Sequence, residues 1–376
     1  MSRLTARLDE AIDTAITAER LVGCVVLVRR EGVDVYSRAA GLRDREAGLP
    51  MERDTIFRLA SVSKLFTATA AMRLVQEHVV ELDEPIDMWL RRFRPALTDG
   101  TVPTITLAHL LTHTSGLGYR FGQPDDHPYH ALGVSDGLDA RVRDLDENLA
   151  RLAQAPLHFA PGAAWRYSLG LDVTGALLAA ASGVTFPEVM RHAVLGPLEL
   201  RDTGFAVRDP ERLAVPYADG DERPVRMTDP HELVEGDEGV VTYSPGRALD
   251  PEAYPSGGAG MAGTADEVLR LLEALRTGGG PVLRAENAAA MLEDRVGPGA
   301  EADGPGWGFG FAGAVLDDPE AARVPHAPRT VEWGGAYGHH WFIDRDAGLT
   351  AVILTNTTLE GMSGPSRKAI VQAIYG

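Results

Sequence analysis

Leu59-Ala60-Ser61-Val62-Ser63-Lys64-Leu65-Phe66-Thr67-Ala68-Thr69-Ala70 is the stretch that decides the fold. Ser61 and Lys64 lie three residues apart, so a helix would place their side chains on one face. Apolar residues flank the pair on both sides, which predicts a buried helix that begins near Ser61. Because an unpaired buried ammonium group is costly, a lysine in such a run requires a chemical reason.

Lysine is rare in this chain, which makes Lys64 informative. Of the 36 basic residues, only Lys64 and Lys368 are lysines and the others are arginines. An arginine stays protonated in proteins, whereas a desolvated lysine can lose its proton and act as a base. A neutral Lys64 amine would therefore activate the Ser61 hydroxyl as a nucleophile. Taken alone, S-x-x-K is a weak pattern, and a surface lysine beside an unrelated serine is the alternative reading.

Length and composition restrict the class of protein. The 376 residues, 44% hydrophobic and 24% charged, suit a globular protein of two or three lobes. A net charge of −18 argues against binding of nucleic acid or of an anionic membrane surface. The single cysteine, Cys24, lies in an apolar run and excludes an internal disulfide. Since no stretch resembles a signal peptide or a membrane span, we expect a cytoplasmic protein without nucleic-acid or membrane partners, of unspecified oligomeric state.

The pattern of apolar residues predicts strands at both ends of the chain and helices in the middle. Strands are expected at 21–30, 33–39, 307–315, 330–334, 338–344 and 349–356. Helices are expected at 107–111, 145–153, 173–181, 186–193, 265–276, 284–293 and 363–375, and a surface loop at 220–255. The simplest assembly is an α+β fold with one antiparallel sheet flanked by helices, built from residues 1–81 and 238–376. Residues 82–237 would then form an inserted all-helical domain.

Two further clusters carry candidate chemistry. Tyr167 follows the turn at Pro161-Gly162 and precedes a predicted helix, so its phenol could face the space between the lobes. A packed aromatic side chain is the alternative for this residue. Gly334-Gly335 lies in a predicted strand, and paired glycines can leave backbone N–H groups available to an oxyanion. A bulge in a twisted strand would explain the same glycines.

The order of these clusters resembles the serine β-lactamase and penicillin-binding-protein superfamily, most closely its class C branch. The resemblance extends along nearly the whole chain, through segments 57–61, 110–117, 254–261 and 354–356. Leu169 stands where that branch has the asparagine of Y-x-N, and Trp333 stands where it has the lysine of K-T-G. Both replacements are typical of the family VIII carboxylesterases, which share the β-lactamase fold and cleave esters.

The resemblance implies roles for individual residues. Ser61 would be the nucleophile, with Lys64 and Tyr167 as the proton-transfer pair. The backbone N–H groups of Ser61 and Ala336 would form the oxyanion hole, and Trp333 would be a wall of the pocket. The remaining candidates are Asp172 as a supporting residue behind the site and Gly334, Gly335, Leu169, Leu117, Tyr119 and Trp341 as pocket-lining residues.

The two replacements make the expected pocket more apolar. An indole at Trp333 in place of a cation removes a charge-assisted hydrogen bond to a substrate carboxylate, worth about 1.5–3 kcal/mol. Leu169 likewise removes an amide that could bind a substrate amide. We therefore expect a serine carboxylesterase that hydrolyses small to medium uncharged esters through a Ser61 acyl-enzyme, with no metal or cofactor. The alternatives are a β-lactamase or D-alanyl peptidase, an acyltransferase or amide hydrolase, and a binding protein without activity.

Two other patterns are candidates for a nucleophile or a metal site. Gly133-Val134-Ser135-Asp136-Gly137 fits the G-x-S-x-G nucleophile elbow, but the strand and helix that this motif needs are not predicted around it. His339 and His340 are adjacent, so on a strand they would point to opposite faces. Carboxylates with ligand spacing are also missing from the sequence around them. We predict that both histidines, and His113, are structural or pocket-lining and not metal ligands.

Overall fold

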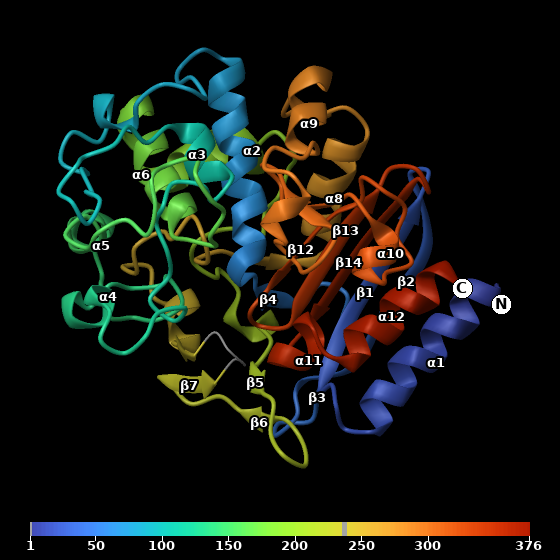
Figure 1. Ribbon diagram of the computed structural model, residues 1–376. Coiled ribbons are helices and arrows are strands. Elements are labelled where there is room, and N and C mark those ends of the chain that lie inside the picture. The colour runs from blue at the N-terminus through green and yellow to red at the C-terminus, as the bar shows by residue number, and fades with distance from the viewer. Residues whose placement is uncertain (1, 235–238) are drawn as a thin grey trace.

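An eight-stranded antiparallel sheet forms the centre of the computed structural model, which describes residues 2–234 and 239–376 (Figure 1). The strand order is β10-β11-β12-β13-β14-β1-β2-β3. Strand β1 pairs with β14, and Cys24 lies opposite Thr355, so the two ends of the chain share one sheet as predicted. The strands are β1 (Gly23–Arg30), β2 (Val33–Asp44), β3 (Leu49–Pro50), β10 (Trp307–Phe309), β11 (Ala314–Leu316), β12 (Val331–Gly335), β13 (His339–Asp344) and β14 (Leu349–Thr355).

Helices cover both faces of this sheet. Helices α1 (Arg3–Thr17) and α12 (Pro365–Tyr375) lie side by side on one face, close to the two termini (Figure 1). Helix α8 (Ala265–Arg276) packs against β14 and β1 on the other face. Successive residues of β14 alternate between the two cores, since Ile353 packs with α1 and α12 whereas Val352 belongs to the larger core on the opposite face.

Helix α2 (Ser63–Gln76) runs between the sheet and the helical middle of the chain (Figure 1). Every residue from Ser63 to Met72 is buried, which explains why the sequence of this helix is apolar all round. The helices that surround it or continue the middle region are α3 (Leu107–Leu111), α4 (Pro128–Leu132), α5 (Leu145–Leu152), α6 (Gly170–Ser182), α7 (Phe186–Met190) and α9 (Ala285–Met291). Shorter elements are η1 (Ala60–Val62), η2 (Ile86–Met88), η3 (Arg191–Leu195), η4 (Pro210–Arg212), η6 (Pro245–Leu249), η7 (Pro298–Ala300), α10 (Pro319–Ala322) and α11 (Thr358–Met362).

Two segments differ from the expected elements. Residues 307–315, predicted as one strand, form β10 and β11, because a turn closed by a 2.8 Å hydrogen bond from Gly310 N–H to the Gly313 carbonyl reverses the chain. Residues 220–255, predicted as a loop, contain strands that pair in small sheets outside the central one, although 235–238 lie outside the described residues. These and the other short strands are β4 (Ile56–Arg58), β5 (Tyr217–Ala218), β6 (Val225–Arg226), β7 (His231–Val234), β8 (Val240–Tyr243) and β9 (Ala262–Thr264).

The central sheet also indicates how the chain divides into domains. Every strand of this sheet comes from the two outer parts of the chain. We therefore propose that residues 1–81 and 238–376 form a sheet domain and residues 82–237 a helical insertion, with their second boundary outside the described residues. One apolar core nevertheless runs through α2, α6 and α8 and joins the two parts. In the described chain no single helix is both long and apolar enough to cross a membrane, and only the bent pair 170–182 and 186–195 meets that test jointly.

Candidate active site

Ser61 lies on the short turn η1, directly before helix α2. The preceding residue, Ala60, has a φ of +45°, which is unfavourable for a residue with a Cβ atom. This conformation is fixed by its surroundings, since Ala60 is fully buried and the Leu59 N–H donates a 2.8 Å hydrogen bond to the Met261 carbonyl. The turn therefore holds the Ser61 side chain at one position, where it lines a cavity.

Lys64 is buried beside Ser61, as the sequence predicts. Its Nζ donates hydrogen bonds to Ser61 Oγ at 3.0 Å and to the Gly258 carbonyl at 2.8 Å. Burial lowers the pKa of Lys64 to about 7, while the negative charge of Asp172 acts in the opposite direction. An amine with this pKa is present in its neutral form at physiological pH, so it can accept a proton from a neighbouring hydroxyl.

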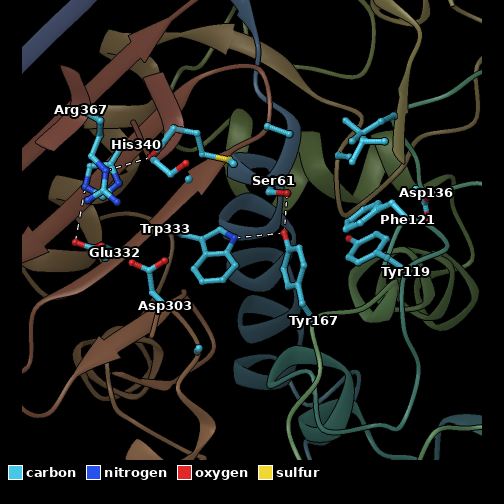
Figure 2. A pocket seen from close by; sticks show the side chains of 18 of the residues that line it. Ser61, Tyr119, Phe121, Asp136, Tyr167, Asp303, Glu332, Trp333, His340 and Arg367 are labelled. Atoms are coloured by element: carbon cyan, nitrogen blue, oxygen red, sulfur yellow. Dashed lines mark hydrogen bonds and ion pairs between the residues drawn. The ribbon is translucent and has the colours of Figure 1, made fainter. Parts of the chain in front are cut away.

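The Tyr167 hydroxyl also points at Ser61 (Figure 2), and Lys64 Nζ lies 4.6 Å from the centre of the Tyr167 ring. Its hydroxyl donates a hydrogen bond to Ser61 Oγ at 2.6 Å and accepts one from Trp333 Nε1 at 3.3 Å. The ring of His113 packs edge-on against the Tyr167 ring, with centroids 4.9 Å apart, and His113 Nδ1 lies 3.0 Å from Ser168 Oγ. The phenol is therefore oriented at its hydroxyl and supported along its ring.

Gly258 is a part of the site that the sequence analysis missed. Its carbonyl accepts the second hydrogen bond of Lys64, between residues 194 positions apart in the chain. A Cβ atom at Gly258 would lie 2.7 Å from Asp172 Oδ2 and 3.1 Å from the Tyr119 hydroxyl oxygen, so only glycine fits there. The available signal was the glycine pair in Ser256-Gly257-Gly258, but its partner could not be inferred from spacing.

Asp172 lies behind this contact, on the first turn of α6. The side chain is fully buried, and this burial raises the pKa of the carboxyl group. The Ser256 hydroxyl and the charge of Lys64 act against the shift and favour the ionised form. The supporting role that the resemblance implies for Asp172 stays a prediction.

The end of strand β12 supplies the opposite wall. A Cβ atom at Gly335 would lie 2.5 Å from the Leu59 carbonyl oxygen, so the strand end packs directly on the segment that precedes Ser61. Ala336 follows this glycine and lines the same cavity as Ser61. We propose that the backbone N–H groups of Ser61 and Ala336 form an oxyanion hole, because both belong to this contact region.

The cavity has a volume of about 370 Å³ and two chemically different ends (Figure 2). At one end the Tyr119 ring stacks on Phe121, with centroids 4.8 Å apart. Beyond Trp333 the other end is charged, and it is lined by Asp303, Glu332, His340 and Arg367. The sequence predicts neither end in full, and the lining residues that were not predicted include Phe121, Asp136, Leu138, Trp165, Val241, Asp303 and Arg367.

Some of the expected pocket residues lie elsewhere. Trp333, Gly334 and Tyr119 line the cavity, as predicted. The prediction is wrong for the side chains of Leu117 and Leu169, which are 1% and 0% exposed and pack in the large core. Motif position fixes the place of a residue along the chain but not the direction of its side chain. The same correction applies to two buried residues near β12 that do not line the cavity, Gly335 and Trp341.

The competing serine, Ser135, belongs to a buried polar cluster. Its Oγ donates a 2.8 Å hydrogen bond to Asp139 Oδ1 and accepts hydrogen bonds from the Gly137 N–H and the Tyr254 hydroxyl. The residue is fully buried and does not line the cavity. It lies in a loop after α4, so the strand–turn–helix setting of a nucleophile elbow is absent from this described segment.

The two neighbouring histidines point in opposite directions, as predicted. His339 Nε2 lies 2.8 Å from the Arg58 carbonyl oxygen, whereas His340 lines the charged end of the cavity. The expectation that no carboxylate accompanies them is wrong. Glu332 Oε2 lies 3.7 Å from His340 Nε2 and 3.0 Å from His326 Nε2, because β12 and β13 pair in this register and the loop before β12 brings in His326.

The fold is an antiparallel sheet between helical layers. A serine and a buried lysine lie at the start of the helix between the sheet and the helical region. This combination defines the class of the serine β-lactamases and penicillin-binding proteins. The chain belongs to the Beta-lactamase family, whose model matches residues 8–375. Esterase EstB of Burkholderia gladioli is 53% identical over 374 residues, covering 99% of this chain and 95% of EstB.

Two further comparisons agree with this assignment. The solved structure of EstCE1, a hydrolase with promiscuous acyltransferase activity, superposes with a TM-score of 0.98 at 47% identity, covering 100% of this chain and 99% of that one. Lovastatin esterase of Penicillium rubens is 27% identical over 381 aligned positions, covering 92% of this chain and 91% of that protein. The predicted fold is confirmed, and the similarities agree with the resemblance to family VIII carboxylesterases.

Proposed function

We propose that this protein is a serine carboxylesterase that hydrolyses small to medium carboxylic esters through an acyl-enzyme on Ser61. The observation that carries the proposal is the convergence of two proton-transfer groups on one hydroxyl. Lys64 Nζ lies 3.0 Å and the Tyr167 hydroxyl 2.6 Å from Ser61 Oγ, within a cavity that a small ester can enter. The names of EstB and of the lovastatin esterase support the same reaction type.

In the first half-reaction, Ser61 Oγ attacks the ester carbonyl carbon while neutral Lys64 accepts its proton. The carbonyl oxygen becomes an oxyanion, which the N–H groups of Ser61 and Ala336 stabilise, each contributing about 3 kcal/mol by analogy with other oxyanion holes. When the tetrahedral intermediate collapses, the carbon–oxygen bond to the alcohol breaks. The Tyr167 hydroxyl donates its proton to the departing alkoxide and recovers one from Lys64, so the alcohol leaves neutral.

In the second half-reaction, water occupies the place of the alcohol. Tyr167 and Lys64 act in the reverse direction, removing a proton from water as it attacks the acyl carbon. The second tetrahedral intermediate then releases the carboxylic acid, and Ser61 Oγ recovers its proton. All steps use groups that already contact Ser61 Oγ or line the same cavity.

The cavity favours uncharged groups next to the reacting carbon. Trp333 presents an indole whose N–H is directed to Tyr167, so it offers no cation to a substrate carboxylate. The stacked rings of Tyr119 and Phe121 supply an apolar surface on the other side of Ser61. Next to Ser61 these walls suit alkyl and aryl esters and disfavour the carboxylate that β-lactams and D-alanyl peptides carry, since the Arg367 cation lies beyond Trp333 at the charged end (Figure 2).

Acyl transfer is a second candidate reaction, because EstCE1, at 47% identity, is a hydrolase with promiscuous acyltransferase activity. The same acyl-enzyme would react with an alcohol in place of water. An apolar cavity wall favours the binding of such an alcohol, and the proton transfers are identical. Transfer would then compete with hydrolysis in proportion to alcohol concentration.

One set of rate measurements tests these assignments. We expect kcat/KM for p-nitrophenyl butyrate to exceed that for nitrocefin by about 10–100-fold, which corresponds to the loss of one charge-assisted contact. Replacing Trp333→Lys should narrow this ratio, since it restores a cation. Product analysis with added 1-butanol should detect butyl butyrate beside butyrate. A preference for nitrocefin would contradict the esterase assignment, and an absence of butyl butyrate would exclude acyl transfer to this alcohol.

A further inference from the structure

We propose that His326, Glu332 and His340 form a binding site for a divalent transition-metal ion, with zinc as the best match, at the charged end of the substrate cavity. Glu332 and His340 lie there beyond Trp333, on the side away from Tyr167 (Figure 2). The proposal is independent of the ester reaction, which uses none of these three side chains.

The spacing of the three donor atoms matches a tetrahedral ion. Glu332 Oε2 lies 3.0 Å from His326 Nε2 and 3.7 Å from His340 Nε2, and all three atoms lie within 4.8 Å of one another. Zinc bonds of about 2.0–2.2 Å place tetrahedral ligands about 3.3–3.6 Å apart. Small side-chain movements would therefore close the three atoms around one ion, in the two-histidine, one-carboxylate set that zinc accepts.

The same atoms are buried and have few partners besides one another. The side chains of His326, Glu332 and His340 are 0%, 2% and 3% exposed. Within the described chain, these three atoms have no hydrogen-bond partner outside the cluster, and their polar contacts are with one another and, for Glu332, with Asp303. Buried polar atoms are usually hydrogen-bonded, so three such atoms pointing at one another require an explanation. A shared cation satisfies all three at once.

The far side of His326 is arranged as it is in metal-ligating histidines. The Tyr375 hydroxyl donates a 2.7 Å hydrogen bond to Asp344 Oδ2, so its oxygen is left to accept from His326 Nδ1, 2.9 Å away. With the proton on Nδ1, the Nε2 lone pair faces the Glu332 carboxylate. Two acceptors at 3.0 Å repel unless a cation lies between them, and an orienting second partner of this kind is typical of zinc-bound histidine.

The charged neighbours set the accessibility and strength of the site. Glu332 and His340 line the cavity, so an ion can enter from it and keep one coordination position open to solvent or substrate. Asp303 adds a second carboxylate beside Glu332 (Figure 2). Arg367 weakens the binding of a cation, because its positive charge acts on His340 and Glu332. Its Nε donates a hydrogen bond to the Met362 carbonyl. The alternative occupant is a single proton shared by His326 and Glu332.

Metal titration distinguishes the ion from the proton. Tag-free full-length protein is stripped with EDTA, dialysed, and titrated with Zn²⁺ by calorimetry and with Co²⁺ by visible absorption. We expect one equivalent per chain, a d–d spectrum of tetrahedral Co²⁺, and a melting temperature that rises with Zn²⁺. Because His340 and Glu332 would be ligands themselves, affinity should fall in His340→Gln and Glu332→Gln by more than the about 10–100-fold that loss of an orienting partner costs, and it should increase in Arg367→Met.

Two control variants make the result specific. His78 lies 3.4 Å from Glu81 at an exposed position, so His78→Gln removes a surface histidine–carboxylate pair and should leave binding unchanged. Ser61→Ala should also bind metal normally, which separates this proposal from the ester reaction. A wild-type protein without the Co²⁺ spectrum or the Zn²⁺-dependent melting shift would overturn the proposal, whether or not the variants fold. Equal loss of binding in His78→Gln and His340→Gln would do the same.

Discussion

Ser61 and Ser135 both lie in sequence motifs of hydrolytic enzymes, but the fold treats them differently. Ser61 Oγ accepts hydrogen bonds from Lys64 and Tyr167 and faces a cavity. Ser135 Oγ is fully buried and donates a hydrogen bond to Asp139 Oδ1. The first hydroxyl has a base beside it and space for a substrate, whereas the second holds a loop together.

The difference shows what a nucleophile needs beyond its motif. Ser135 already has a carboxylate that accepts its hydrogen bond. Because this pair is buried, an ester has no path to the Ser135 hydroxyl. Ser61 has an amine whose burial lowers its pKa, and the same cavity that admits substrate receives both Ser61 and Tyr167. Reactivity therefore follows from the environment of the side chain, and the predictions below change that environment.

The largest effect is expected from Lys64→Arg, which keeps the positive charge and removes the base. A guanidinium group stays protonated, so it cannot accept the Ser61 proton, and kcat for p-nitrophenyl butyrate should fall about 10²–10⁴-fold. The matched control is Lys368→Arg, because Lys368 is the other lysine of the chain and is exposed on α12. An active Lys64→Arg variant with an unchanged melting temperature would show that Lys64 is not the base.

A smaller effect is expected on the pH profile. With the pKa of Lys64 at about 7, kcat/KM should rise tenfold per pH unit below pH 7 and level off above it, as the amine loses its proton. The charge of Asp172 raises this pKa, so Asp172→Asn should move the rising limb to lower pH by about one unit.

The control for this shift is Asp266→Asn, which changes a carboxylate paired with Arg53 at the surface. Its pH profile should match that of the wild type. A limb that moves to higher pH in Asp172→Asn, or that does not move at all, would contradict the electrostatic link between Asp172 and Lys64.

The sequence predicts the Ser61 centre well because its evidence is local. The three-residue spacing of Ser61 and Lys64 and the apolar run around them require only a helix, and that helix is present. The joining of the two chain ends into one sheet followed from the distribution of strand patterns. The role of Tyr167 could be predicted only from the order of motifs along the chain, since nothing local distinguishes its phenol from a packed aromatic side chain.

What the sequence could not give depends on long-range contacts and side-chain direction. The Gly258 carbonyl reaches Lys64 across 194 positions, and Asp303, Glu332 and Arg367 meet at one end of the cavity from separate segments. Leu169 occupies a motif position, but its side chain points into the core. Strand pairing likewise brings Glu332 to His340, a proximity that their separation in sequence conceals.

Covalent labelling tests the central claim most directly. The wild-type protein, the Ser61→Ala variant and the Ser135→Ala variant are treated with a fluorophosphonate probe, and the modified peptide is located by mass spectrometry. The account predicts one adduct on Ser61 in the wild type and in Ser135→Ala, and none in Ser61→Ala. An adduct on Ser135, or undiminished labelling and ester cleavage by Ser61→Ala, would contradict it.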